Sequence, residues 1–160
     1  MTMTPFGPDV DTRYMNVALA QARRAARLGE VPVGAVLVDV AGVVVARGYN
    51  LVERYHTQCA HAEMRLIQRV SKQRGDWRLD GHWLYVTLEP CGMCMGLIVL
   101  SRLAGVVFGA SSPLFGYGLS TGSSSVPYRK GSVVVIAGVG AQEATALLKQ
   151  FFQHQRKNKN

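Results

Sequence analysis

The stretch Leu84-Tyr85-Val86-Thr87-Leu88-Glu89-Pro90-Cys91-Gly92-Met93-Cys94 joins a run of apolar residues to two cysteines that lie three residues apart. The apolar run, which begins at Trp83 and ends at Leu88, predicts a buried strand. A helix is expected over 91–100, and the following strand, over 104–110, is too apolar to be exposed on either face. This strand–helix–strand order is typical of a layered α/β domain.

The rest of the chain continues the alternation of strands and helices. An amphipathic helix is expected over 9–28, where apolar residues recur at helical spacing from Val10 to Leu28 and arginines fall opposite. The other elements are expected as strands over 31–38, 43–49 and 133–137 and as helices over 61–72 and 141–156. Since no linker or internal repeat interrupts this order, we expect one domain over residues 1–160, with helices on both faces of a five-stranded sheet.

Composition narrows the class of protein. The chain has 160 residues and is 48% apolar, which excludes wholesale disorder, and its three cysteines cannot form a closed set of internal disulfides. The first ten residues have no basic region followed by an apolar run, so we expect no secretory signal and a reducing, cytoplasmic compartment. The apolar stretch 92–110 is interrupted by Arg102 and by glycines, so we expect a helix and a strand there rather than a membrane span.

The formal net charge of +8 is unevenly distributed. Residues 129–160 hold six basic residues and one acid, whereas residues 111–128 hold no charged residue. The neutral segment is rich in Ser, Gly and aromatic residues, and it predicts a long loop over 111–132. The end of the chain, 141–160, predicts a helix with a basic tail, which indicates either a polyanionic partner such as nucleic acid or a solvated terminus.

Two short segments carry the candidate chemistry. His61-Ala62-Glu63 opens one predicted helix, and Pro90-Cys91-Gly92-Met93-Cys94 opens another. Both are expected to follow strands at the same edge of the sheet, where open α/β sheets place their sites. The sulfurs of Cys91 and Cys94 should face the same way in the first helical turn, where the helix dipole favours the thiolate. Two thiolates and the imidazole of His61 suit one zinc ion per chain and leave a fourth position open for water.

Glu63 is expected beside the metal without being bound to it. Two thiolates already cancel the charge of zinc, and a carboxylate ligand would make bound water harder to ionise. We therefore interpret Glu63 as a proton carrier between water and a leaving group. The main alternative, a thioredoxin-like dithiol at Cys91 and Cys94, leaves His61 and Glu63 unexplained. Cys59 is interpreted as a small packed residue, because a fourth ligand would close the site.

In these motifs the sequence resembles the zinc-dependent nucleoside and nucleobase deaminases, and among them the bacterial tRNA-specific adenosine deaminases. The resemblance covers most of the chain and is carried, in order, by Val31–Val36, Gly48–Asn50, His61–Glu63, Leu84–Cys91, Val106–Ala110 and Ala146–Phe152. It implies the cytidine deaminase-like fold, a three-layer α/β/α domain with a central five-stranded mixed sheet. It also implies a homodimer.

The resemblance further implies a reaction, the hydrolytic deamination of adenosine to inosine at the wobble position of a tRNA anticodon. Zinc would be held by His61, Cys91 and Cys94. Zinc hydroxide would be the nucleophile, and Glu63 would shuttle protons. By matching positions, the residues expected in the nucleoside pocket are Asn50, Val33 and Ala62. An RNA substrate also gives the basic tail a target, so Arg156 and Lys157 are expected on its phosphates and Phe152 on a base. Phe152 also lies on the apolar stripe of its helix, so packing is the competing interpretation.

Two departures from the family pattern concern RNA recognition. Where the family typically has an Asp and a Lys, this sequence has Ser111–Gly116, and the pair Gln58-Cys59 replaces a Pro-Thr. Stacking and hydroxyl contacts from Phe115, Tyr117 and nearby serines could substitute. Two alternative functions stay open. A deaminase of a free base or nucleoside, such as guanine or cytosine, would not need the charge of +8, and intact Glu63 argues against a non-catalytic RNA-binding subunit.

Overall fold

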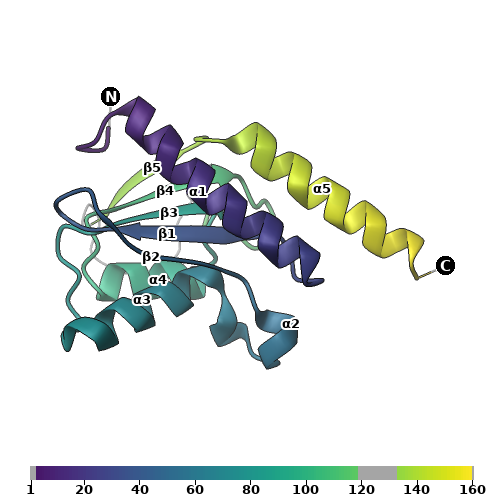
Figure 1. The fold of residues 1–160 in the computed structure, drawn as a ribbon, viewed down its shortest axis with the longest axis horizontal. Helices are drawn as coiled ribbons and strands as arrows, with labels where there is room; N and C mark the ends of the chain where they lie inside the picture. Colours follow the sequence, from purple (N-terminus) through teal and green to yellow (C-terminus); the bar gives the residue numbers. More distant parts are fainter. Residues whose placement is uncertain (1–2, 119–132, 160) are drawn as a thin grey trace.

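A mixed sheet of five strands, in the order β2-β1-β3-β4-β5, forms the middle layer of the computed structural model, which describes residues 3–118 and 133–159 (Figure 1). The bounds of the strands are β1 Gly34–Val38, β2 Val44–Tyr49, β3 Trp83–Leu88, β4 Gly105–Ala110 and β5 Val134–Ala137. β1 is antiparallel to both β2 and β3, whereas β3, β4 and β5 run parallel to one another. The expected mixed sheet is confirmed, although most strands begin slightly later than the apolar runs predicted.

A tight turn sets the antiparallel pairing of β1 with β2. The side chain of Asp39 accepts hydrogen bonds from the backbone N–H groups of Ala41 and Val43, both at 2.9 Å, and Gly42 adopts a φ of 79°. Aspartate favours such local bonding, and glycine adopts a positive φ without steric cost. The turn therefore brings the end of β2 back beside the start of β1.

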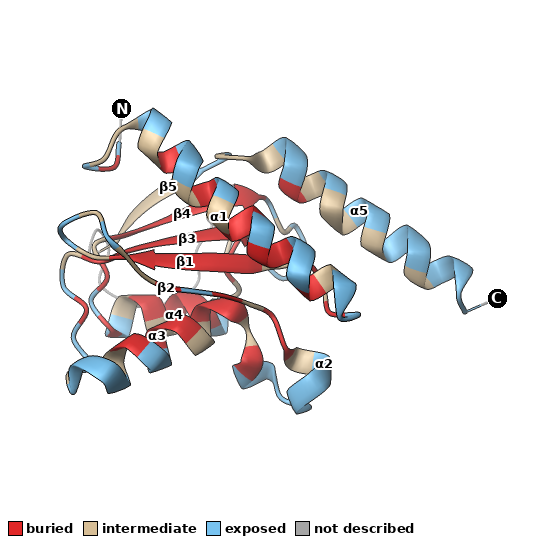
Figure 2. Cartoon of the chain, in the orientation of Figure 1, coloured by how far each residue is buried: buried red, intermediate tan, exposed pale blue. Residues whose placement is uncertain are grey.

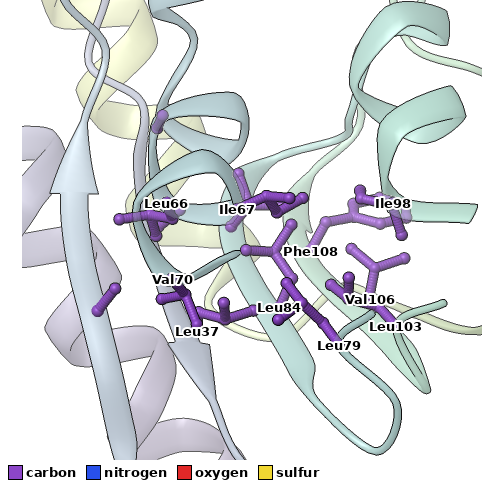
Figure 3. Close-up of a cluster of buried hydrophobic side chains, with 14 of the residues drawn as sticks. Leu37, Leu66, Ile67, Val70, Leu79, Leu84, Ile98, Leu103, Val106 and Phe108 are labelled. Carbon is purple, nitrogen blue, oxygen red and sulfur yellow. The ribbon is translucent and has the colours of Figure 1, made fainter. Parts of the chain in front are cut away.

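Helices cover both faces of the sheet, as the alternation predicted (Figure 1). α1 (Pro8–Arg27) and α5 (Ala141–Lys157) cover one face, and α3 (Ala62–Arg74) and α4 (Gly92–Leu100) cover the other. β1 and β4 are buried throughout their length (Figure 2). Figure 3 shows the cluster of buried hydrophobic side chains between the sheet and the pair α3 and α4, and a second cluster lies between the sheet and the pair α1 and α5. Each large apolar side chain buried in these clusters contributes about 1.5–3 kcal/mol, so the two clusters hold the three layers together.

Two short helical turns between β2 and α3 were not expected from the sequence. α2 spans Val52–Tyr55 and the 3₁₀ turn η1 spans Gln58–Ala60, so His61 follows a turn and not a strand. Elements of this length are too short for a helical period to be recognised. Cys59 lies in η1 and is exposed, so its interpretation as a packed residue is wrong. Thr57 accepts its backbone N–H at 3.2 Å, which holds the turn while the thiol lies at the surface.

The expected loop over 111–132 is described as far as residue 118, and the remainder of that prediction lies outside the described residues. Within the described part, the backbone of Gly116 bridges to that of Cys91. α5 occupies the stretch for which a C-terminal helix was expected. Across residues 3–118 and 133–159, no helix is both long and apolar enough to cross a membrane.

One edge of the sheet gathers the start of β1 and the ends of its neighbours. Because β1 is antiparallel to β3, the start of β1 lies beside the end of β3, and the end of parallel β4 lies on the other side of β3. The hairpin brings the end of β2 to the same edge. α4 begins directly after β3 at this edge, so side chains at its first turn meet residues that follow β2 and β4. The two motifs, His61–Glu63 and Pro90–Cys94, were expected at one edge of the sheet, and both lie at this one.

Gly34, at the start of β1, lies against the backbone of α1. A Cβ atom at this position would overlap the carbonyl oxygen of Ala18 and the backbone nitrogen of Ala22, neither of which can move alone. We expect Gly34→Ala to lower the free energy of unfolding in urea by about 3 kcal/mol, the upper end for overpacking. Gly92→Ala is the matched control, because no atom lies within 4 Å of its added methyl group. Equal stabilities of the two variants would contradict the close packing of β1 on α1.

Candidate metal centre and active-site cavity

Three side chains converge here from the starts of two helices. His61 occupies the N-cap of α3 and Cys91 the N-cap of α4, and neither side chain caps its own helix. Cys94 lies one turn into α4 and is fully buried. The Sγ atoms of Cys91 and Cys94 lie 3.7 and 3.4 Å from Nδ1 of His61. The three ligand atoms all lie within 4.8 Å of one another, so the three residues are positioned to bind a metal ion.

These distances fit a tetrahedral zinc site. Zn–S bonds of about 2.3 Å and a Zn–N bond of about 2.0–2.1 Å, meeting at the tetrahedral angle, place sulfur and nitrogen about 3.6 Å apart. The two observed separations lie on either side of this value. A redox dithiol does not require an imidazole nitrogen in contact with both sulfurs, so the arrangement favours a metal centre over the thioredoxin-like alternative. Three protein ligands leave a fourth position for water or substrate.

The second ring nitrogen of His61 fixes the orientation of the imidazole. Nε2 lies 3.0 Å from Oε1 of Gln58, in the preceding turn η1. An amide oxygen only accepts hydrogen bonds, so this contact places a proton on Nε2, and Nδ1 is the nitrogen that faces the two sulfurs. Metal-bound histidines commonly donate their other N–H in this way. In the sequence Gln58 was only a departure from the family pattern, and nothing there indicated this contact.

The two cysteines differ in how readily each loses its proton. A hydrogen bond from the Cys94 thiol lowers the pKa of Cys91 to about 4, and His61 adds to this effect. The same hydrogen bond, together with burial, raises the pKa of Cys94. The hydrogen bond to Cys91 also raises the pKa of His61. Zinc binding would release the shared proton, because a coordinating thiol is deprotonated.

Glu63 lies beside the ligands at the second position of α3. It is only 4% exposed, and burial raises the pKa of its carboxyl group, with a backbone hydrogen bond and the charge of His61 acting in the opposite direction. A carboxyl group with a raised pKa can both take up and release a proton near neutral pH. The arrangement can therefore exchange protons with a water molecule at the open position of a metal.

A cavity of about 880 Å³ is lined by these groups. His61, Glu63 and Cys91 contribute to its surface, together with Val33 and Asn50. Pockets that enclose small organic ligands measure roughly 300–1,000 Å³, so a nucleoside fits. The third residue predicted for the pocket, Ala62, is fully buried in the core between the sheet and α3, and its side chain does not line the cavity.

A buried carboxylate that the sequence did not single out supports one wall of the cavity. Glu30 is 1% exposed and accepts hydrogen bonds from Nδ2 of Asn50 at 3.3 Å and from the backbone N–H groups of Glu53 and Arg54 at 3.1 and 2.8 Å. These donors offset the cost of burying the carboxylate. Because a carboxylate only accepts hydrogen bonds, Glu30 fixes the orientation of the Asn50 amide, with Nδ2 directed toward the carboxylate.

The residues predicted to touch RNA differ in their distance from the cavity. Phe152 is 45% exposed and lines the cavity, so it is not a core residue despite its place on the apolar stripe. Arg156 lines a neighbouring groove that also includes Phe152 and Lys149. Lys157 is exposed and lines neither. Phe152 therefore belongs to the cavity and Arg156 to the groove beside it, whereas Lys157 lies outside both.

Comparisons with known proteins agree with this geometry. The profile of the cytidine and deoxycytidylate deaminase zinc-binding region matches residues 8–110. The tRNA-specific adenosine deaminase of Bacillus subtilis (strain 168) is 44% identical over 150 residues, which cover 93% of this chain and 92% of the relative. A structure solved in studies of A-to-I editing by tRNA:A34 deaminases matches with a TM-score of 0.77 and 35% identity, over 86% of this chain and 99% of that chain. A guanine deaminase from Nitrosomonas europaea shares the fold, with a TM-score of 0.71 and 21% identity over 94% of this chain and 93% of its own.

Zinc content should distinguish the ligands from their neighbours. We expect Cys94→Ser to reduce bound zinc from about one ion per chain to almost none and to lower Tm, because metal binding contributes to folding free energy. Cys59→Ser, which alters an exposed thiol near His61, should leave the zinc content and Tm unchanged. Glu63→Ala should leave the zinc content unchanged. Elemental analysis of dialysed protein and thermal melts measure these quantities. Loss of zinc from Glu63→Ala would make Glu63 a ligand, and full zinc in Cys94→Ser would rule out the proposed ligand set.

Proposed function

We propose that this chain, which belongs to the cytidine and deoxycytidylate deaminase family, hydrolytically deaminates adenosine to inosine at the wobble position of a tRNA anticodon. The observation that carries the choice of substrate is the similarity to tRNA-specific adenosine deaminases over nearly the whole chain. The site supports the reaction class, because three metal-binding side chains and a buried carboxyl group meet at one cavity.

The reaction adds water at C6 of the adenine ring and releases ammonia. Zinc, when held by His61, Cys91 and Cys94, lowers the pKa of water so that a nucleophile is available near neutral pH. Glu63 accepts one proton from the attacking water and donates it to N1 of the ring. It then passes the second proton from the new hydroxyl group to the departing amine. Adenosine and water are thereby converted to inosine and ammonia.

The environment of Glu63 suits this double transfer. Its burial keeps bulk water away, and the raised pKa means that the acid form is accessible while the carboxylate can be regenerated. His61 is two residues away and would be fixed by zinc, so it is not available as a competing proton carrier. We therefore assign the catalytic role to Glu63.

Asn50 and Val33 are proposed to hold the nucleoside. Both line the cavity, and the Asn50 amide is oriented by Glu30, so it can hydrogen-bond the substrate without first reorienting. Val33 offers an apolar surface to the base. Ala62 is enclosed by the core and does not line the cavity, so we assign it no contact with the nucleoside.

RNA outside the cavity is proposed to follow α5. Phe152 borders both the cavity and the groove that contains Arg156, and Lys157 extends the positive charge toward the chain end. Arginine and lysine side chains at such positions bind phosphates without reading sequence. We further propose that the protein is cytoplasmic and that it forms a homodimer, as the resemblance implies for the dimer. A mass of 17.4 kDa by light scattering, that of one chain, would contradict the dimer.

The decisive assay is ammonia release from a tRNA anticodon stem-loop with adenosine at the wobble position. We expect turnover of this RNA, none when guanosine replaces the wobble adenosine, and none from free adenosine, guanine or cytidine. Glu63→Ala should be inactive while retaining zinc, which controls for contaminating activity. Turnover of a free base or nucleoside without turnover of the stem-loop would favour the alternative enzyme. Tight stem-loop binding by the zinc-loaded protein, with no turnover of any substrate, would favour a non-catalytic subunit.

The basic end of α5 should contribute to affinity through phosphates. We expect Arg156→Ala combined with Lys157→Ala to weaken stem-loop binding and to reduce the slope of log K against log salt by about one to two units. Lys72→Ala combined with Arg74→Ala is the matched control, because it also removes two exposed charges from the last turn of a helix, here α3. Equal slopes for the two double variants would mean that the tail is only a solvated end.

A further inference from the structure

Exposed apolar side chains gather around the mouth of the active-site cavity. Met93, Leu114, Phe115 and Phe152 all line the cavity, yet they are 40%, 86%, 78% and 45% exposed. We call these four residues the rim. Apolar side chains left in water singly need no explanation, but a group of them around one opening marks a binding surface.

The turn that carries Leu114 and Phe115 is held in place by backbone hydrogen bonds. The N–H of Gly116 donates to the carbonyl oxygen of Ser112 at 2.8 Å, which closes the turn. A buried carboxylate, Glu89, accepts the N–H of Ser112 at 3.3 Å. The two most exposed rim residues therefore project from a closed turn and not from a free end.

This turn is also tied to the segment that bears the metal ligands. The N–H of Tyr117 donates to the carbonyl oxygen of Pro90 at 2.9 Å, and Gly116 bridges to Cys91. Gly116 packs so closely on Glu89 that a Cβ would overlap the carboxylate. The backbone of the turn that carries Phe115 is therefore held against the segment that bears Cys91.

The position of the rim indicates what covers it. A protein seated on these four side chains would close the cavity that leads to His61 and Glu63. The occupant must therefore belong to the substrate. The cavity of about 880 Å³ lies near the upper end of the range for small ligands, so it has room for more than one nucleoside. In an unpaired RNA strand, bases next to the target can be splayed out and stacked on aromatic side chains.

Charge near the rim is consistent with RNA. Phe152 and Leu148 line both the cavity and the adjoining groove, and that groove contains Lys149 and Arg156. A strand whose bases lie on the rim can therefore place its backbone phosphates on α5. Apolar surface next to cationic surface is the combination that binds single-stranded nucleic acid.

We propose that Phe115 is a stacking platform for the nucleobase adjacent to the target adenosine, and that Leu114 and Met93 flank this base with apolar contacts. The proposal rests on the proposed function and adds a specificity element to it. The substrate class it defines is an unpaired RNA strand that places one base beside Glu63 and stacks its neighbour on Phe115. A double-stranded RNA would not meet this requirement.

The test uses zinc-loaded protein and stem-loops with 2-aminopurine on either side of the wobble adenosine, because stacking quenches its fluorescence. We expect Phe115→Ala to abolish the quenching at one flanking position and to raise KM for the unlabelled stem-loop by about 5- to 150-fold, with kcat changed by less than about threefold. Phe115→Tyr should restore both values, and Phe115→Leu should restore neither. Trp77→Ala, which removes a half-exposed aromatic side chain in the segment between α3 and β3, should change nothing.

Three results would overturn the proposal. Phe115→Leu with the affinity and quenching of the original chain would show that any apolar side chain suffices. Unchanged KM and quenching in Phe115→Ala would mean that no base stacks there. Conversion of a dimer to a monomer by Phe115→Ala, measured by light scattering, would make the rim a subunit interface. Because quenching reports binding without turnover, failure of the deaminase assay and failure of this platform are separate outcomes.

Discussion

Three ligand atoms from two segments thirty residues apart must meet within bonding distance of one cation, and the domain is arranged around this requirement. β3 and the start of α4 deliver Cys91 and Cys94 together, because one helical turn carries both. His61 arrives by a separate route through β2, α2 and η1. The two routes converge because the start of antiparallel β1 lies between the end of β2 and the end of β3, which puts all three at one edge of the sheet. Two helix N-termini then point at the site, where their dipoles favour thiolates.

The same edge of the sheet buries three carboxyl groups that are compensated in different ways. Glu30 is matched by an amide and two backbone N–H donors, and Glu89 accepts a backbone N–H from Ser112. Both groups accept hydrogen bonds from residues that line the cavity. At Glu63 burial is the largest influence, and it raises the pKa of the carboxyl group. Its environment therefore suits Glu63 for exchanging a proton.

The fold was predictable because most of its strands are apolar runs and its long helices span several turns. The ligands were predictable because Cys91 and Cys94 share one turn and His61 opens a helix. Gln58 and Glu30 could not be predicted. Gln58 acts through one hydrogen bond with His61, and Glu30 acts partly through backbone N–H groups, whose positions the sequence does not reveal. Cys59 was misjudged because the apolar character of a free thiol says nothing about a three-residue turn.

In the proposed mode of binding, the rim and the basic helix α5 divide the recognition of RNA between two kinds of contact. Phosphate contacts made by α5 depend on charge and carry no sequence information. Stacking on Phe115 tolerates every base, because each base has a π-face. Neither contact can select an adenosine alone, so under this proposal selection falls to the wall around Asn50 and to the cavity that Phe115 and Glu63 both line. Only a strand whose adjacent bases are unstacked can place one base in the cavity and the next on Phe115, which favours a loop over a helix. The conformation of the RNA strand would then restrict which nucleotides reach Glu63, before any hydrogen bond distinguishes one base from another.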